Sequence, residues 1–487
     1  MKQTMHIFMK DVRHLWPGIL VVLTFTAAFA YAGAVSPGAF GQLPDPYPTL
    51  TALTLPLGWA YLIAAVIHQE ALPGHHQYWL TRPYSWKSLL VAKALFIVSF
   101  INVPKLLADF VILEGQGFQA ASYWSGFIAS QLLFTAVWLL PYSALAAVTS
   151  NLRQFVLAVL IVWVLLILPS LFLARPSDLL SRGFWFGAVW MQNFMIIGIF
   201  LTASLVILLW QYSRRRTALS RVIALCAMIL VLAVPNLISM RALMAAQMRL
   251  SKSRMDVPAI QAVLDSTRKE PKTKQTGRRP GYEGTIAIGI PLQISGLPAG
   301  TSMFFDDVKV EIEEPDGEVS VATGTIEQEV DGVWERLFVR PDVFQRLKEE
   351  QVTLRHSAYL SLLGDPRTTQ IEPGERGTVV PDLGICRFVR QGSDYTIVCF
   401  TPFRRSPVFA STSIPDFGYG DDPEPASYSP FPAEPGISPL VTSARVNGAT
   451  EFQGSLMPRV VTKSAFAHIR HDFEIRGLRL EDCALRD

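Results

Sequence analysis

The first half of the chain contains a series of apolar stretches, each long enough to cross a lipid bilayer. A membrane-spanning helix needs about 20 mostly apolar residues, and soluble proteins rarely sustain such runs. Two stretches, Phe155 to Leu173 and Val222 to Met240, contain no charged residue. The sequence therefore predicts an α-helical polytopic membrane domain over residues 15–240. Its seven expected spans lie near 15–35, 50–67, 89–113, 124–148, 155–173, 184–210 and 222–240.

Composition divides the 487-residue chain into two parts. Half of all residues are hydrophobic and 17% are charged, but most of the apolar residues precede Met240 and most of the charges follow it. This asymmetry predicts a membrane part followed by an aqueous part. The net charge of +3 and the lack of a basic stripe interleaved with aromatics give no indication of a nucleic-acid partner.

Residues 1–15 are expected to form an amphipathic elbow helix that lies at the membrane interface and leads into the first span. A cleaved signal peptide is the alternative, because Lys2, Lys10 and Arg13 precede a run ending at Ala30-Tyr31-Ala32. The orientation of the later spans is the same in both cases. The apolar residues that recur at helical spacing are Met5, Phe8, Met9, Val12, Leu15 and Trp16.

The distribution of Lys and Arg predicts the orientation. With the N-terminus in the cytoplasm, eleven Lys and Arg residues fall on the cytoplasmic side, and the short outer loops hold only Arg175 and Arg182. Seven crossings then place everything after Met240 outside the cytoplasm. The basic stretch from Arg241 to Arg254 opposes this arrangement, but long translocated domains are largely exempt from the rule. We therefore expect a multi-pass protein of the inner or plasma membrane.

Two opposite charges fall inside the third expected span. Lys105 and Asp109 are one helical turn apart, so they can neutralise each other in the membrane. One interpretation is a polar lining of a substrate path or a subunit contact. The other is that both side chains extend toward the outer interface without a function.

The segment between the second and third spans carries the most specific pattern. It contains Glu70, a Pro73-Gly74 turn, the run Tyr78-Trp79-Leu80-Thr81-Arg82-Pro83, and a closing Ala92-Lys93. This pattern resembles the corresponding loop of ABC-2 type transporter permeases. The start Phe8-Met9-Lys10-Asp11-Val12-Arg13 is similar to the N-terminal elbow helix of that family. The resemblance covers residues 5–240.

The resemblance implies that the chain is the membrane-spanning permease subunit of an ATP-driven exporter. The cytoplasmic loop 69–88 would dock on a separate ATPase subunit, and the permease would be a homo- or heterodimer. ATP and Mg would be bound by the partner ATPase, because the chain lacks the GxxxxGK(S/T) phosphate loop. The implied contact residues are Glu70, Trp79, Arg82 and Lys87.

Other interpretations stay open. The loop 69–88 could be a plain interfacial connector, and the family norm of six spans without a large outer domain differs from this chain. The rival function is a membrane-anchored sensor or assembly protein whose outer domain binds a ligand or partner. We expect no enzyme, because the chain has no GxSxG elbow for a nucleophilic serine. We expect no metal site either. His68, Glu70, His75 and His76 are close together but do not form HExxH on one helix face, and His468 and His471 fall on opposite sides of an alternating strand.

Beyond the last span, the sequence predicts a helix from Ala242 to Leu264 and a basic linker within 241–280. From 281 to 487 the hydrophobic period drops to two, which predicts an all-β, sandwich- or barrel-like extracytoplasmic domain. Pro315-Asp316-Gly317 is a hairpin turn between two such strands. The stretch 415–439, rich in Pro and Gly, is expected to be a long loop.

One hairpin places two cysteines opposite each other. A two-residue turn at Gly392-Ser393 pairs Cys386 with Cys399 at a non-hydrogen-bonded position, where Cα atoms approach to about 4.5 Å. That separation permits a disulfide. A Cys386–Cys399 bridge would indicate an oxidising outer compartment, whereas two free thiols would fit a cytosolic domain.

Overall fold

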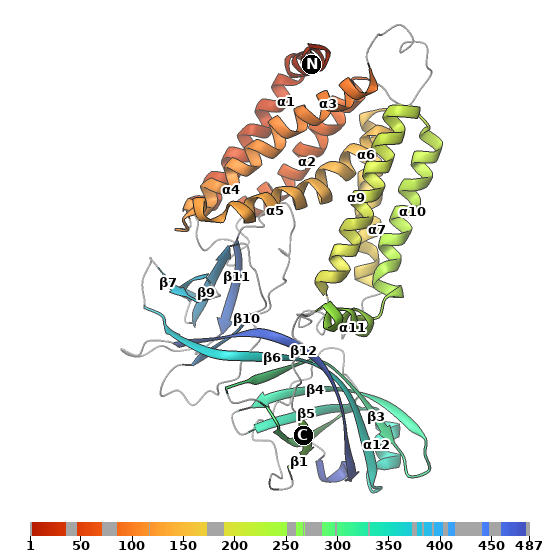
Figure 1. Ribbon diagram of the computed structural model, residues 1–487, viewed down its shortest axis with the longest axis vertical. Coiled ribbons are helices and arrows are strands. Elements are labelled where there is room, and N and C mark those ends of the chain that lie inside the picture. Colours follow the sequence, from red (N-terminus) through yellow and green to blue (C-terminus); the bar gives the residue numbers. More distant parts are fainter. Residues whose placement is uncertain are drawn as a thin grey trace.

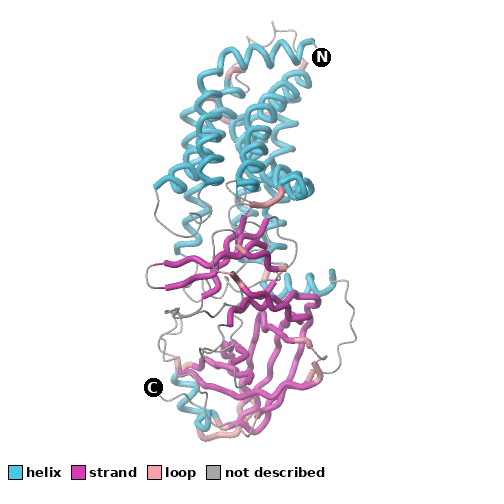
Figure 2. The backbone as a smooth tube through the Cα atoms, turned by 90° about the vertical axis from the view of Figure 1, so that its left-hand side faces the viewer, coloured by secondary structure: helices cyan, strands magenta, loops and turns pink. Residues whose placement is uncertain are grey.

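The computed structural model describes most of the chain, in a series of segments. The described residues are 2–35, 46–70, 85–115, 117–172, 189–250, 260–265, 267, 285–297, 300–329, 332–372, 377–381, 384–391, 394–402, 408–413, 441–447 and 459–483. They form a helical bundle and a β-rich region that lie end to end, with the N-terminus at the end of the bundle farthest from the strands (Figures 1 and 2).

Within these described segments, five helices are long and apolar enough to cross a membrane. They are Lys2–Ala34, Trp86–Gly115, Ala120–Val148, Met191–Arg214 and Thr217–Val234. Two shorter apolar helices, Thr54–His68 and Leu152–Leu165, lie at the second and fifth expected spans. Many large apolar side chains of the bundle are exposed, including Leu107 at 61% and Leu132 at 67%, which is typical of a lipid-facing surface.

The interfacial helix and the first span that we expected over 1–35 are one continuous helix, α1. Figure 2 shows the start of α1 lying across the end of the bundle before the helix runs along it. Ile7, Leu15 and Ile19 recur on its buried face, which packs against α2, α3 and α4. The helices of the bundle and its foot are α1 Lys2–Val35, α2 Pro46–His68, α3 Trp86–Ile97, α4 Val103–Gly115, α5 Trp124–Phe134, α6 Leu140–Val148, α7 Leu152–Phe172, α9 Val189–Arg214, α10 Thr217–Leu237 and α11 Met240–Leu250.

Two π-helical turns interrupt the third and fourth expected spans. The turn Val98–Asn102 joins α3 to α4, and the turn Thr135–Leu139 joins α5 to α6. Each is followed within two residues by a proline, Pro104 or Pro141. Because proline has no N–H group, it leaves the carbonyl four residues earlier without its helical partner, and that carbonyl lies within the π turn. The prolines that the sequence places in these spans thus explain where the helices widen.

The β-rich region consists of two antiparallel sheets. An eight-stranded sheet has the order β1-β2-β5-β4-β3-β6-β12-β10, and a four-stranded sheet has the order β11-β9-β8-β7. The larger sheet packs its apolar face around Ile288, Val310, Leu337 and Leu354, with α12 (Pro341–Leu347) against it. The strands are β1 Gln261–Leu264, β2 Ile286–Ser295, β3 Ser302–Glu313, β4 Val319–Glu329, β5 Gly332–Val339, β6 Val352–Gln370, β7 Thr378–Val380, β8 Gly384–Gln391, β9 Asp394–Pro402, β10 Val408–Ser413, β11 Val441–Asn447 and β12 Arg459–Leu478.

Two predicted hairpins are confirmed and one predicted helix is wrong. Glu313 pairs with Val319 across the turn that contains Gly317, whose φ of +87° favours glycine. The expected helix from Ala242 to Leu264 is wrong at its C-terminal end: among the described residues α11 spans Met240–Leu250, and residues 261–264 form strand β1 beside β2. Pro258 precedes this strand, and proline disfavours a helical conformation in the residue before it. The expected loop 415–439 lies outside the described residues.

The hairpin of β8 and β9 has the predicted register. Gln391 pairs with Asp394, and Cys386 faces Cys399 across the ladder. Cys386 is fully buried and disulfide-bonded, whereas Cys226 and Cys483 are free.

Two small apolar clusters join the bundle to the sheets. Leu243 and Met244 of α11 pack on Tyr359 of β6, together with Met191 of α9. At a second place, Ile385 of β8 packs against a cluster of the α4–α5 turn that includes Phe118 and Phe127. Arg241 adds a hydrogen bond from its guanidinium to the carbonyl oxygen of Ser357, at 3.4 Å. The sheets therefore contact the ends of three bundle elements directly.

Candidate functional site

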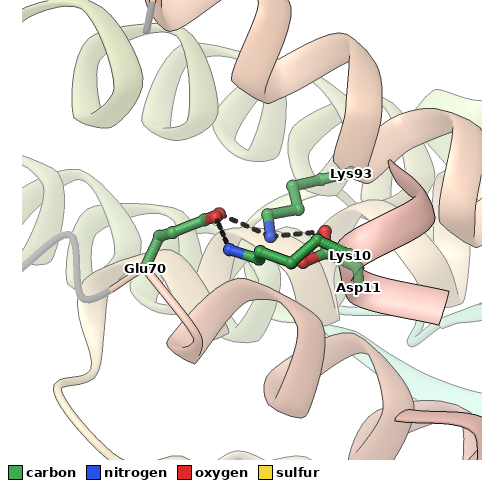
Figure 3. A network of polar contacts seen from close by, with 4 residues as sticks. All are labelled: Lys10, Asp11, Glu70 and Lys93. Atoms are coloured by element: carbon green, nitrogen blue, oxygen red, sulfur yellow. Dashed lines mark hydrogen bonds and ion pairs between the residues drawn. The ribbon is translucent and has the colours of Figure 1, made fainter. Parts of the chain in front are cut away.

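Four charged side chains meet at the end of the bundle that holds the N-terminus (Figure 3). Lys10 and Asp11 come from α1, Glu70 follows the last turn of α2, and Lys93 comes from α3. The side chains of Asp11, Glu70 and Lys93 are at most 3% exposed, and that of Lys10 is 41% exposed. We call these four residues the charge network.

The distances show how the charge network is connected. Lys93 Nζ lies 2.8 Å from Asp11 Oδ2, to which it donates a hydrogen bond, and 2.5 Å from Glu70 Oε2 as an ion pair. Lys10 Nζ donates to Glu70 Oε1 at 2.6 Å. Two cations and two carboxylates make the network neutral, so each buried charge is compensated. Its ion pairs link α1, α3 and the residue that follows α2.

Local sequence explains why these charges turn inward. Asp11 lies four residues from both Ile7 and Leu15, on the stripe that α1 buries against the bundle. Lys93 lies on the buried face of α3 with Leu89, Ala92 and Phe96. A charge on an apolar helix face requires a partner, because an unpaired buried charge costs several kcal/mol. The spacing therefore shows that Asp11 and Lys93 each need a buried partner, although it does not show that they pair with each other.

Neighbouring contacts fix the same end of the bundle. His68, at the end of α2, lies with Nε2 3.0 Å from the carbonyl oxygen of Ala146 and 3.1 Å from Thr149 Oγ1. Arg221 of α10 donates to the carbonyl oxygen of Val148, which satisfies the C-terminal end of α6. Through these contacts, α2 and α10 are attached to α6 beside the charge network.

The structure changes the role expected of Glu70. We expected its carboxylate to contact a partner subunit, but both of its oxygens face lysines inside the bundle, and the side chain is 1% exposed. Lys87 is exposed near the start of α3, with its ammonium group 5.7 Å from the centre of the Trp86 ring. Trp79 and Arg82 lie outside the described residues. The Glu70 carboxylate is therefore directed into the bundle rather than exposed at its surface.

A second polar group lies deeper in the bundle. Lys105 and Asp109 of α4 form an ion pair, and their side chains are 1% and 0% exposed. Asn102, in the first π turn, donates to Gln131 Oε1 at 3.2 Å and to Thr135 Oγ1 at 2.9 Å. Both charged side chains are therefore buried inside the protein and compensate each other.

One acidic group has the spacing of a metal site. Glu314, Asp316 and Glu318 surround the β3–β4 turn. Glu314 instead accepts hydrogen bonds from Arg346 and Ser320. His468 and His471 stand three residues apart on β12 in an unbroken register, so they face opposite sides of the sheet.

No family model and no curated protein matches the chain.

Proposed function

We propose that this chain is the membrane-spanning permease subunit of an ATP-driven exporter of the ABC-2 type. In this proposal it crosses the membrane seven times, with the N-terminus in the cytoplasm and the β-rich region outside. It works as a homo- or heterodimer with a separate ATPase, which binds ATP and Mg. The resemblance of the segment from Glu70 to Lys93 and of the start of α1 motivates the proposal.

The observation that carries the proposal is the position of the charge network. Glu70 lies two residues after the end of α2 at His68, at the start of the proposed docking loop 69–88. Its carboxylate is ion-paired with α1 through Lys10 and with α3 through Lys93. A movement of the loop would therefore be passed to α1 and α3 through the ion pairs of Glu70, and to α2 through the chain itself. ATP-driven closure of the ATPase pair would use this connection to reorient the spans.

Co-purification from the native membrane tests the proposal. We expect the wild-type chain to recover a nucleotide-binding subunit, and Arg82→Glu to lose it because the charge at the loop is reversed. Arg153→Glu is the matched control, since Arg153 is an exposed arginine in the first turn of α7 and is not part of the loop 69–88. Full recovery of the ATPase with Arg82→Glu would remove the docking role of the loop.

The second candidate is a membrane-anchored sensor or assembly protein. The contacts of Tyr359 with Leu243 and Met244 favour it, because they join the eight-stranded sheet to the foot of the bundle. A ligand or partner bound by the sheet would then be signalled through α11. Function that survives deletion of the loop 69–88, without any co-purified ATPase, would favour this candidate over the exporter.

A further inference from the structure

The exposed face of the first turns of α1 forms an open groove of about 690 Å³. The residues that line it recur at helical spacing along a single face, from the first described turn of the helix to the fourth. They are Lys2, Met5, His6, Met9, Lys10, Arg13 and His14.

The groove has one sign of charge. Three of its lining residues are Lys or Arg, two are His, and none is acidic. Asp11 is the only acidic residue between 1 and 44, and its side chain is fully buried in the charge network. An anion that enters the groove therefore meets Lys2 and Arg13 without an acidic residue in the lining.

The groove also has an apolar component. Met5 and Met9 are 55% and 45% exposed between the cations, and Trp16 follows at 57%. Apolar side chains beside Lys and Arg on one helix are typical of a helix that rests in the headgroup layer of a membrane. α1 continues directly into a helix apolar enough to cross the membrane, which fixes its first turns near that layer.

We propose that this groove binds the phosphate of anionic phospholipids, with Lys2 and Arg13 as its main ligands and Met5 and Met9 against the glycerol and upper acyl region. Each Lys or Arg near an anionic membrane surface contributes about 1 kcal/mol, so two cations suffice for a clear preference over a zwitterionic lipid.

Lys10 connects this groove to the charge network. It lines the groove, yet its Nζ lies 2.6 Å from Glu70 Oε1 (Figure 3). A phosphate in the groove competes with Glu70 for this ammonium group and leaves Glu70 paired with Lys93 alone. Anionic lipid would thereby loosen the connection between α1 and the docking loop. This last step rests on the proposed function, whereas lipid binding does not.

Native mass spectrometry of the full chain in detergent tests the binding. The protein is exchanged into an equimolar mixture of phosphatidylglycerol and phosphatidylcholine, and the ratio of retained lipids is measured. We expect wild type to retain phosphatidylglycerol preferentially, and Lys2→Gln/Arg13→Gln to lower this ratio by about tenfold or more, since each cation is worth about fivefold. The matched control is Arg214→Gln/Arg216→Gln, which removes two exposed charges at the end of α9 outside the groove.

The outcomes separate the possible occupants. An unchanged ratio in Lys2→Gln/Arg13→Gln, or an equal fall in the control, would overturn the proposal. Displacement of the lipid by millimolar inorganic phosphate would also overturn it, because the methionines would then contribute nothing. If wild type showed no lipid preference and Lys2→Gln/Arg13→Gln lost a co-purified acidic protein, the groove would bind that protein and the lipid proposal would be wrong. An ATPase that still co-purifies while the ratio collapses would support lipid binding independently of the exporter proposal.

Discussion

Lys93 donates a hydrogen bond to Asp11 across 82 residues of sequence, and both side chains are almost completely buried. The pair connects α3 to α1, and Glu70 joins it from the end of α2. Its burial makes it a sensitive point of the bundle, because the loss of either charge leaves the charge network with one uncompensated charge.

Replacing Lys93 by methionine should destabilise the bundle strongly. Asp11 and Glu70 would then be two buried carboxylates with only Lys10 to compensate them. Removal of one member of a buried ion pair typically costs about 3–5 kcal/mol. Thermal unfolding in detergent, followed by circular dichroism, measures the effect. Lys87→Met, which changes an exposed lysine of the same helix, should shift the midpoint little. Equal midpoints for the two variants would show that the network carries no stability.

Gly115→Ala should weaken the contact between α1 and α4. A methyl group at Gly115 would lie 2.7 Å from the Cα atom of Ala34 and 2.9 Å from its carbonyl oxygen, so the backbones must move apart. Such overpacking typically costs about 1–3 kcal/mol. Gly198→Ala in α9 is the control, because nothing lies within 4 Å of the added methyl group. The same unfolding measurement should show a loss for the first variant and no loss for the second.

Two of the four cysteines should be protected from alkylation in the denatured, unreduced protein. Cys386 is disulfide-bonded and faces Cys399, whereas Cys226 and Cys483 are free. Mass spectrometry after N-ethylmaleimide treatment in denaturant should find two labels without reductant and four with it. Four labels without reductant would contradict the bridge and the oxidising compartment that it indicates.

Cys483 should react slowly in the native protein although it is free. Burial, together with the neighbouring charge of Asp482, raises the pKa of its thiol to about 11. The thiolate is the reactive form, so at pH 8 we expect alkylation about 100-fold slower than for an ordinary thiol. The rate should rise as the pH approaches 11. Peptide mapping after timed iodoacetamide labelling measures it, and a native rate equal to that of the unfolded chain would contradict the prediction.

The parts of the fold that depend on local periodicity could be predicted from the sequence. Stretches of about 20 apolar residues indicated the helices. Alternation of apolar and polar residues beside turn-forming residues indicated strands such as β3, β4, β8 and β9. Strand β1 was missed because four residues, Gln261–Leu264, are too few to show a period, and the basic helix before them suggested continuation. The pairing of β8 with β9 was predictable because a tight turn fixes its register.

The charge network could be predicted only in part. Glu70 and Lys93 stand out in the loop pattern, but their inward direction depends on how α1, α2 and α3 pack. Sequence alone shows that these residues are charged. Because Glu70 falls in a loop expected at the membrane interface, its side chain was expected to be exposed. The burial of Asp11 on the face of Ile7 and Leu15 was visible in the spacing, but its partner 82 residues away was not.

The topology is the central claim, and a reporter fused after Asp487 tests it most directly. Alkaline phosphatase is active only outside the cytoplasm, and a green fluorescent protein fusion is fluorescent only inside it. The account predicts an active phosphatase and a dark fluorescent fusion, with the reverse pattern for fusions within the loop 69–88. A fluorescent, phosphatase-negative C-terminus would contradict the seven crossings, the oxidised cysteine pair and the proposed docking side together.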